Sequence, residues 1–269
     1  MKFAHGVLIM EKEAIFGEHT PQDLNFTSSA LNTNFISLES GGFIVANNHV
    51  FQNIPRTSLS KFILRESVKG TPLFKFGSGD PNEPKVMIIS GIHGNEIPPQ
   101  IASLYLINKL KNAYINGTIY IIPFSAPKAT MDNSRWFNHM DLNRAATKKG
   151  SISNIILKKI QELKIDSVGD FHSTAPGSNP GKEGIFCTLE PSYESYKIGK
   201  HISKYVGSDV IHYEKAGSAY KGALEDECNL LGIPAVTCEV VSPNGYADEM
   251  SFTRSFAQMV SYLEYFDII

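Results

Sequence analysis

The fold is decided by residues 85–96, which read Lys85-Val86-Met87-Ile88-Ile89-Ser90-Gly91-Ile92-His93-Gly94-Asn95-Glu96. The apolar run over 86–89 is typical of a strand that is buried on both faces of a sheet. Gly91 and Gly94 then allow the backbone to turn sharply into a helix predicted from residue 96. A buried strand followed directly by a helix is the repeating unit of an α/β fold.

The same alternation of strands and helices continues to the end of the chain. Near-continuous Val, Ile and Leu in the strands favour a largely parallel sheet that is covered on both faces, so the predicted fold class is α/β. Function is expected in the loops after the carboxyl ends of these strands. Strands are predicted at 118–123, 185–189, 210–213 and 234–240, with another ending at His172, helices at about 96–112, 152–164, 193–206, 222–231 and 250–265, and a long loop from 123 to about 150.

Residues 1–83 differ from the rest in being rich in Asn, Ser, Thr and Phe. Short β-like runs at 35–38 and 43–46 flank Gly41-Gly42 and predict a hairpin, and a third run at 73–76 ends in a cluster of turn residues. We therefore predict an N-terminal β-rich extension over 1–83, followed by the main domain over 84–269. The pattern leaves open whether the extension is part of the same domain.

Composition excludes several classes of protein. The chain has 269 residues, 42% of them hydrophobic and 19% charged, which does not fit a disordered, collagen-like or coiled-coil protein. Its formal net charge is −2, so it lacks the positive field expected of a protein that binds nucleic acid or an anionic membrane. Neither partner is expected.

Cysteine usage bears on the compartment. Cys187, Cys228 and Cys238 are odd in number and form no CxxC pair, which favours buried free thiols in a reducing compartment. The first ten residues are too weakly apolar for a signal peptide, and no segment reaches eighteen apolar residues. The sequence predicts a cytoplasmic protein.

Three polar residues at strand ends form a candidate metal site. His93 and Glu96 are three residues apart across the glycine turn, and His172 ends another predicted strand. Two imidazole nitrogens and one carboxylate oxygen form a ligand set that zinc accepts in catalytic sites, with a fourth position left for water. Taken singly, each histidine could be an ordinary core or loop residue, and Glu96 could be an acid that stabilises a helix N-terminus.

Glu239 lies in an otherwise apolar predicted strand. An unpaired carboxylate there would be costly, so the side chain must be paired, be protonated or face a polar cleft. A carboxylate facing a cleft beside a metal can act as general base on water. The alternative is that Glu239 lies at a strand end on the surface.

The loop at 131–144 contains Arg135 and Arg144, two of only five arginines in the chain, together with the only tryptophan. Arg recognises a carboxylate through two parallel hydrogen bonds, which suits a site that selects an acidic substrate group. The alternative for either arginine is an ordinary loop salt bridge.

Other catalytic motifs are missing from the sequence. The segment 177–183 resembles a phosphate-binding loop, but its first glycine is one residue too close and Glu183 replaces the magnesium-binding Ser or Thr. No HExxH, GxSxG or GxGxxG pattern occurs. The sequence therefore argues against zincin proteases, serine hydrolases and NAD enzymes.

Four segments occur in the order and approximate spacing of a known family: Gly91-Ile92-His93-Gly94-Asn95-Glu96, Asp141-Leu142-Asn143-Arg144, Asp170-Phe171-His172-Ser173-Thr174 and Thr237-Cys238-Glu239. Over residues 84–265 the chain resembles the zinc carboxypeptidase superfamily, and within it the succinylglutamate desuccinylase/aspartoacylase branch. The resemblance implies a mixed, mostly parallel sheet between helices and a zinc hydrolase catalytic domain over 84–269.

The resemblance also implies a role for each motif residue. His93, Glu96 and His172 would bind one Zn²⁺ per chain, and Glu239 would be the general base. Asn143 and Arg144 would hold the free carboxylate of the substrate, while Arg135 would polarise the scissile carbonyl. Tyr220 resembles the mobile tyrosine that peptidase members place ahead of the catalytic Glu.

One departure from the family leaves the substrate open. Aspartoacylase-type members carry a β-rich C-terminal domain after the general base, whereas only a final helix can follow Glu239 here. The resemblance therefore implies a hydrolase of an amide bond next to a free carboxylate, either a deacylase of N-acyl amino acids or a carboxypeptidase acting on peptides. A catalytically silent, metal-containing binding module is the third alternative. The sequence does not indicate an oligomeric state.

Overall fold

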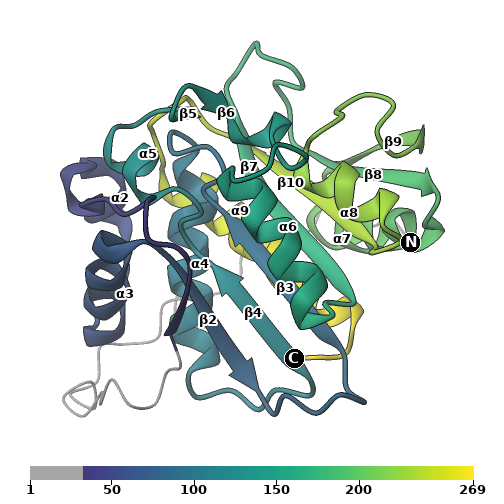
Figure 1. The fold of residues 1–269 in the computed structure, drawn as a ribbon, viewed down its shortest axis with the longest axis horizontal. Helices are drawn as coiled ribbons and strands as arrows, with labels where there is room; N and C mark the ends of the chain where they lie inside the picture. Colours follow the sequence, from purple (N-terminus) through teal and green to yellow (C-terminus); the bar gives the residue numbers. More distant parts are fainter. Residues whose placement is uncertain (1–32) are drawn as a thin grey trace, which may run out of the picture.

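The computed structural model describes residues 33–269 and is built around one eight-stranded sheet (Figure 1). The strand order is β1-β2-β4-β3-β7-β10-β8-β9. The strands are β1 (Thr33–Ser37), β2 (Thr71–Gly77), β3 (Lys85–Ser90), β4 (Thr118–Ile122), β7 (Ser167–Thr174), β8 (Gly184–Glu190), β9 (Asp209–Lys215) and β10 (Ala235–Val241). The helices are α2 (Asn48–Asn53), α3 (Ser58–Lys69), α4 (Ile97–Leu110), α5 (Pro127–Met131), α6 (Ile152–Leu163), α7 (Tyr193–Val206), α8 (Leu224–Leu230) and α9 (Glu249–Tyr265).

The sheet is mixed and mostly parallel, which confirms the predicted fold class. Strands β4, β3, β7 and β10 form a continuous parallel centre, and β8 pairs with β9 in parallel at one edge. Antiparallel pairs join β1 to β2, β2 to β4 and β10 to β8. The carboxyl ends of the central strands therefore meet along one edge of the sheet.

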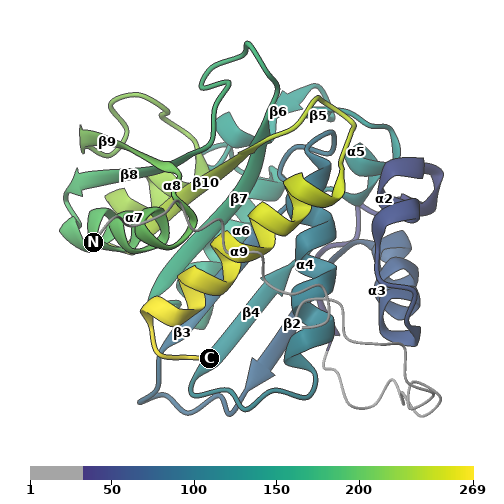
Figure 2. The same ribbon diagram turned by 180° about the vertical axis from the view of Figure 1, so that it is seen from behind.

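Helices cover both faces of the sheet. Helix α6 crosses one face in Figure 1, whereas α4 and α9 cross the other face, as the reverse view in Figure 2 shows. The residues of β3 alternate between the two cores: Val86 and Ile88 pack with α4 and α9, and Met87 and Ile89 pack with α6. Both faces of this strand are buried, which explains its unbroken apolar run.

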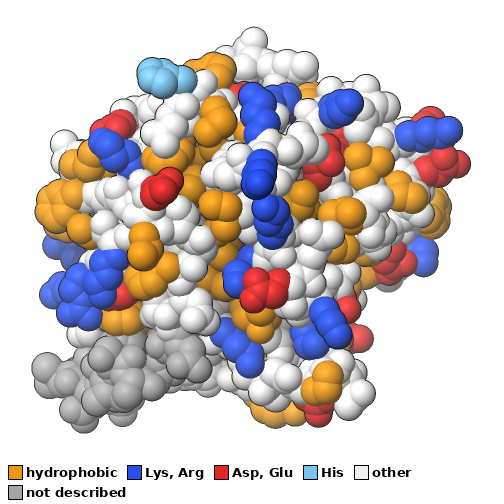
Figure 3. Space-filling view, in the orientation of Figure 1, with side chains coloured by type: hydrophobic (Ala, Val, Ile, Leu, Met, Phe, Trp, Pro, Cys, Tyr) orange, Lys and Arg blue, Asp and Glu red, His pale blue; other side chains and the backbone are white. Residues whose placement is uncertain are grey.

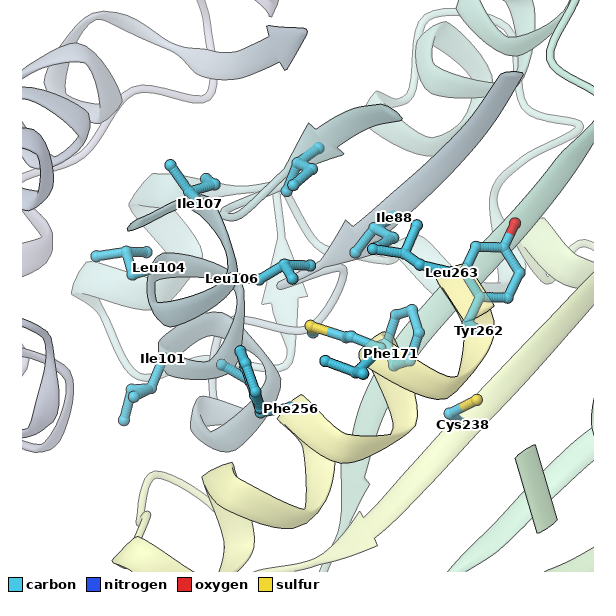
Figure 4. Close-up of a cluster of buried hydrophobic side chains, with 14 of the residues drawn as sticks. Ile88, Ile101, Leu104, Leu106, Ile107, Phe171, Cys238, Phe256, Tyr262 and Leu263 are labelled. Carbon is cyan, nitrogen blue, oxygen red and sulfur yellow. The ribbon is translucent and has the colours of Figure 1, made fainter. Parts of the chain in front are cut away.

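Tight packing around α9 anchors the centre of the sheet. Figure 4 shows Phe171 from β7 beside Tyr262 from α9, and Phe256 of the same helix belongs to the same cluster. The rings of Phe171 and Tyr262 meet edge to face with centroids 6.2 Å apart. The hydroxyl of Tyr262 lies 3.0 Å from Ser167 Oγ, which satisfies this buried polar group. These contacts join α9 to β7, which lies between β3 and β10 in the sheet.

The predicted hairpin at 35–46 is wrong. Strand β1 pairs with β2, and the second β-like run forms a short 3₁₀ helix, η3 (Ile44–Ala46). The glycine pair serves close packing: a Cβ on Gly42 would lie 2.5 Å from the Cα of Lys128 at α5. The glycine pair therefore serves contacts of this segment with α5 rather than a hairpin turn.

The part of the predicted extension that the structure describes is not a separate β layer. Residues 33–83 contain helices α2 and α3 as well as β1 and β2, and β2 pairs with β4 of the central sheet. A β-rich description is therefore too narrow for 33–83, and the division of the chain at residue 83 stays a prediction. The prediction for residues 1–32 lies outside the described residues.

The predicted long loop between β4 and α6 contains short regular elements. Helix α5 is followed by a two-stranded ribbon, β5 (Trp136–Phe137) with β6 (Met140–Asp141), and by the 3₁₀ helix η4 (Leu142–Arg144). Figure 1 shows this segment beside the carboxyl end of β7. Within residues 33–269, no helix combines the length and apolar character needed to span a bilayer.

Candidate active site

The central parallel strands bring three predicted site residues to one place. His93 follows the end of β3, His172 lies near the end of β7, and Glu239 lies in β10 directly opposite His172 in the strand register. Neighbouring parallel strands end at the same edge, so their polar side chains converge there. The alternative of a surface position for Glu239 is excluded, because its Oε2 atom is buried.

The turn that carries His93 and Glu96 is fixed by close packing. A Cβ on Gly94 would lie 2.1 Å from the backbone of Ala129, so only glycine fits. The side-chain amide of Gln100 donates to the carbonyl of Glu96 at 2.7 Å, which closes the turn from the first half of α4. The local sequence therefore presents both side chains in one rigid geometry.

His93, Glu96 and His172 form a buried cluster whose donor atoms converge. Glu96 bridges the two imidazoles, because its Oε1 lies 2.6 Å from His93 Nδ1 and its Oε2 lies 2.7 Å from His172 Nδ1. The three residues are at most 5% exposed, and one ligand atom from each lies within 4.8 Å of the others. Glu96 occupies the N-cap position of α4 but makes no side-chain cap bond, so its carboxylate serves the cluster. This buried His-Glu-His group suggests a metal site.

Each histidine also turns its outer nitrogen toward a second carboxylate. His93 Nε2 lies 2.9 Å from Asp141 Oδ1, and His172 Nε2 lies 3.0 Å from Asp170 Oδ2. Carboxylates behind the imidazoles are the usual outer partners of histidines that bind a metal, because they fix the ring and its tautomer. Neither carboxylate was predicted as a site residue. Asp170 could have been found, since it lies two residues before His172 and therefore on the same face of the strand.

The electrostatics of the cluster favour a cation. Burial alone would raise the pKa of Glu96, but the charges and hydrogen bonds of His93 and His172 outweigh it and lower the pKa far below its usual range. Burial would lower the pKa of His172, but the charges of Asp170 and Glu96 raise it well above its usual value. Glu96 thus stays ionised and favours positive charge beside it. Two imidazoles and a carboxylate fit a divalent transition metal such as zinc.

Glu239 has the opposite electrostatic environment. Burial, reinforced by the negative charge of Glu96, raises its pKa to about 8. Its Oε2 atom has no hydrogen-bond partner within residues 33–269, although the side chain lines the cavity described below. A buried carboxyl group with an unused oxygen and a pKa near neutrality can take up and return a proton.

Arg135 adjoins the cluster from the loop after α5. Its Nη2 lies 3.1 Å from Asp141 Oδ2, and its Nη1 lies 3.4 Å from Glu96 Oε1. The side chain is 39% exposed, so the guanidinium bridges the buried cluster and the open cavity. The loop salt bridge that was the alternative explanation for Arg135 is present as its ion pair with Asp141. This pair positions the guanidinium beside the cluster.

Asn143, Arg144 and Tyr220 lie together on another wall. The guanidinium of Arg144 lies 5.0 Å from the ring centre of Tyr220, in cation–π contact. The backbone N–H of Leu224 donates to Asn143 Oδ1 at 3.4 Å, which ties η4 to the start of α8. Arg144 itself is exposed, and its positive charge is available to a bound anion.

One cavity of about 270 Å³ joins these groups. His93, Glu96, Arg135, Asn143, Arg144, Tyr220 and Glu239 all line it, and His172 lies beneath them against Glu96. Several further lining residues were not predicted as site residues. Asn95, Ser173, Thr174 and Thr237 lie within the motif segments quoted above, whereas Ala175, Ser178, Asn179, Pro180, Phe186, Ala223, Glu225 and Asn244 lie outside them. The structure therefore brings all eight predicted site residues to a single cavity or its floor.

Structural comparison identifies similar folds at low sequence identity. An aspartoacylase family protein from Mesorhizobium loti has a TM-score of 0.57 and 21% identity, with 74% of this chain and 62% of that chain covered. The ectoine utilization protein EutE (DoeB) from Ruegeria pomeroyi has a TM-score of 0.62 and 17% identity, covering 76% and 64%. A metallo-carboxypeptidase from Burkholderia cenocepacia has a TM-score of 0.54 and 15% identity, covering 73% and 61%. The chain thus spans less than two thirds of each of these proteins.

Sequence comparison identifies the family. No curated protein matches the chain. A family model described as "Succinylglutamate desuccinylase/Aspartoacylase catalytic domain" matches residues 82–249, which contain all eight predicted site residues. The match covers more than half of the chain and agrees with the fold, and the protein therefore belongs to the succinylglutamate desuccinylase/aspartoacylase family.

Proposed function

We propose that the protein is a zinc-dependent hydrolase that removes the acyl group from an N-acyl amino acid. The observation that carries the proposal is the buried His93–Glu96–His172 cluster, which lies at one cavity with Glu239 and the positive charge of Arg144. Its family and its structural neighbours indicate a hydrolase. We further propose that the metal is zinc, that the bond hydrolysed is an amide and that the substrate is an N-acyl amino acid.

His93, Glu96 and His172 would hold one Zn²⁺ per chain through two Nδ1 atoms and the carboxylate. Asp141 is hydrogen-bonded to the outer nitrogen of His93, and Asp170 lies 3.0 Å from the outer nitrogen of His172, where each carboxylate would orient its ring. Bound zinc supplies a Lewis acid that activates water as a nucleophile near neutral pH and polarises a carbonyl oxygen.

Glu239 is the general base and proton carrier in this proposal. It faces the cluster from the neighbouring strand with a free carboxylate oxygen, so it can accept the proton of the attacking water. The same carboxyl group then returns the proton to the leaving amine.

Arg135 and Arg144 interact with different negatively charged groups of the substrate in this proposal. Arg135, fixed by Asp141 beside the cluster, stabilises the negative charge that develops on the carbonyl oxygen during attack. Asn143 and Arg144 bind the free carboxylate on the leaving amino acid, and the ring of Tyr220 supports the guanidinium of Arg144. A substrate held at both points has its amide bond beside Glu239.

The size of the cavity supports a small substrate. Its volume of about 270 Å³ lies just below the usual range of ligand pockets, which is about 300 to 1,000 Å³. A short acylated amino acid suits such a space better than the end of a peptide.

Carboxypeptidase activity is the second candidate, because the chemistry is the same and the fold is similar to that of a metallo-carboxypeptidase. The buried free thiols of Cys187, Cys228 and Cys238 support a cytoplasmic location.

Hydrolysis by the metal-free and zinc-loaded protein tests the proposal. The panel contains N-acetyl and N-succinyl amino acids together with dipeptides and tripeptides that have a free C-terminus. We expect zinc at one equivalent and turnover of N-acyl amino acids only when it is bound. Turnover of peptides alone would establish the carboxypeptidase instead. A zinc-loaded protein that is inert toward the whole panel would indicate a binding module, and full zinc occupancy in the His93→Ala/His172→Ala double variant would refute the metal site.

A further inference from the structure

The turn of residues 93–96 is joined to the rest of the fold by a buried amide that the proposed chemistry does not use. Gln100, in α4, has no exposed surface. Its Nε2 donates to the carbonyl oxygens of Glu96 at 2.7 Å and of Gly94 at 3.2 Å, and it lies 3.4 Å from the carbonyl oxygen of His93. One side chain therefore contacts the backbone of both proposed metal ligands in the turn.

The other end of the Gln100 amide is held by Thr130 in α5. Thr130 Oγ1 donates to Gln100 Oε1 at 2.8 Å, and Thr130 is as completely buried as its partner. The orientation of the amide is fixed, because its nitrogen faces carbonyl oxygens, which can only accept. Each polar atom of the two side chains thus has a partner, as buried polar groups require. We call these two side chains the Gln100–Thr130 pair.

The same threonine belongs to the segment that carries Arg135. The carbonyl oxygen of Thr130 accepts a hydrogen bond from the backbone N–H of Asn133 at 3.1 Å, where the chain leaves α5. Arg135 follows two residues later and lies beside the proposed ligands. The Gln100–Thr130 pair therefore joins the turn of residues 93–96 to the loop of Arg135 through hydrogen bonds between buried groups.

A third side chain supports the pair from an earlier part of the chain. Asn47 Nδ2 donates to the carbonyl oxygen of Thr130 at 3.0 Å, and Asn47 is buried. Asn47 Oδ1 accepts from the N–H of Val50 and so caps α2, which lies beside α5 in Figure 1. Asn47 lies outside residues 82–249, which match the family model. The N-terminal part of the described chain thus reaches the proposed metal site through Thr130 and Gln100.

We propose that Gln100 and Thr130 are positioning residues that hold the proposed metal ligands and Arg135 in one geometry, with Asn47 supporting them from outside the matched domain. This inference rests on the proposed function, because the ligands belong to its metal site. Ligands and catalytic groups act only when the contacts behind them fix their positions closely. A turn that can relax binds metal more weakly, and a displaced guanidinium stabilises the reacting carbonyl less.

Zinc affinity is the first test. Thr130→Val removes the hydroxyl and keeps the shape of the side chain, and it should weaken zinc binding at least about tenfold, as loss of an outer partner of a metal site does. Thr130→Ser keeps the hydroxyl and should restore most of the affinity. Competition with a chelating dye measures both. Zinc affinity that is unaltered in Thr130→Val, or equally weak in Thr130→Ser, would overturn the assignment.

Helix α4 offers a matched control in a second pair of an amide and a threonine. Thr57 Oγ1 donates to Asn108 Oδ1 at 2.7 Å, and Asn108 Nδ2 donates to the carbonyl oxygen of Leu104 at 2.8 Å. Thr57 also caps α3, so Thr57→Val should lower the thermal melting temperature without weakening zinc binding. A loss of zinc affinity as large as that in Thr130→Val would overturn the assignment, because it would reflect stability alone.

The Co²⁺-loaded protein provides a readout that stability does not move, since the visible absorption of Co²⁺ depends on the geometry of its ligands. The spectrum should change in Thr130→Val and in Gln100→Met, and it should not change in Thr57→Val. The double variant Gln100→Met/Thr130→Val should bind zinc about as well as Gln100→Met alone, because two side chains that act as a pair are not additive. An unchanged spectrum in both single variants, or fully additive losses, would overturn the assignment.

Asn47→Ser tests the support from outside the matched domain. Serine can still cap α2, but it lacks the amide that donates to Thr130. Zinc affinity should fall, though less than in Thr130→Val, because Asn47 contacts the backbone of Thr130 and not the turn itself. Unaltered affinity in Asn47→Ser would overturn this part of the assignment.

Turnover at saturating zinc tests the position of Arg135. In Thr130→Val, kcat should remain about tenfold low when the metal site is filled, because the loop of Arg135 is still displaced. Full recovery of kcat would overturn the part of the assignment that concerns Arg135. Zinc binding without turnover of any substrate in the unaltered protein would contradict the proposed function, while the affinities of the variants would still test the pair. Failure of the unaltered protein to bind zinc would overturn both. A thermal melt of each variant confirms that it is folded.

Discussion

The two ends of the cavity are built in different ways. The His93–Glu96–His172 cluster comes from the ends of neighbouring parallel strands and is at most 5% exposed. The substrate end comes from loops around 131–146 and 216–225, where Arg144 is exposed and Tyr220 is half-buried. The sheet positions His172, and the close-packed turn after β3 positions His93 and Glu96. Contacts between loops position the substrate end. We therefore expect the sheet end to determine rate and metal affinity, and the loop end to determine which substrate is bound.

The two ends of the cavity also differ in the partners of their charged side chains. At the sheet end, each charged group of the cluster has an oppositely charged partner within about hydrogen-bond distance, such as Glu96 between two imidazoles. At the loop end, Arg144 and Glu225 lie on the same cavity with opposite charges but separate partners, the ring of Tyr220 and the amide of Asn229. On the face seen in Figure 3, acidic and basic side chains are both scattered over the surface.

Replacing the proposed base should have the largest effect. In Glu239→Gln, kcat should fall by about 10²–10⁴, because positioned proton transfer accounts for a factor of that size. KM and zinc content should change little, since Gln has the same shape and Glu239 is outside the ligand cluster. Steady-state kinetics and metal analysis check this. Glu190→Gln, an exposed change at the end of β8, is the control, and an unchanged kcat in Glu239→Gln would disprove the role.

Replacing Arg144, which is proposed to bind the substrate carboxylate, should affect substrate binding more than the rate of the chemical step. Arg144→Ala should raise KM about 10- to 100-fold, because a hydrogen bond to a charged group contributes about 1.5–3 kcal/mol. The kcat value should change much less, since Arg144 is remote from bond making. Lys148→Ala, an exposed cation of the same loop, is the control. A fall in kcat at constant KM would mean that Arg144 acts on the reacting bond.

The outer carboxylates should affect metal binding and not substrate binding. Asp170→Asn should weaken zinc affinity about 10- to 100-fold, because a carboxylate behind a ligating histidine orients the ring and raises its basicity. At saturating zinc, KM should equal that of the unaltered protein. Competition with a chelating dye measures the affinity. Unaltered zinc affinity in both Asp170→Asn and Asp141→Asn would show that the second carboxylates do not support the site.

The smallest expected effect is a pH dependence of stability at the loop end. The folded protein keeps Glu225 protonated to higher pH than the unfolded chain, because burial and then Asp226 raise its pKa. The folded state therefore binds more protons above the ordinary Glu pKa, and the contribution of this group to stability falls as pH rises. In Glu225→Gln, this decrease in stability with rising pH should disappear, because Gln does not titrate.

Urea unfolding at pH 5 and pH 8 measures this effect. The gain in free energy of unfolding from Glu225→Gln should be larger at pH 8, with the metal state held the same at both values. Glu227→Gln should show no such increase. A gain that is greater at pH 5 would contradict a raised pKa for Glu225.

Much of the fold was predictable because strand and helix patterns are local. The apolar run at 86–89 predicts a doubly buried strand, and its residues do alternate between the two cores. The hairpin at 35–46 was not predictable in the same way. Its two runs have suitable residues, but β1 finds its partner in β2, and Gly42 serves the contact with α5. Tertiary packing overrides propensity where short runs have several possible partners.

The sequence by itself determined the types of residue at the strand ends, because glycine turns and apolar runs act over a few neighbouring residues. His93, Glu96, His172 and Glu239 are recognisable on that basis. Only the tertiary structure decided that Asp141 lies behind His93, 48 residues away, and that Leu224 meets Asn143 across 81 residues. Such contacts depend on strand order and loop packing, which one local pattern leaves undetermined. For this reason the candidate metal cluster could be inferred from motifs, whereas lining residues such as Phe186 and Asn244 emerged only from the folded structure.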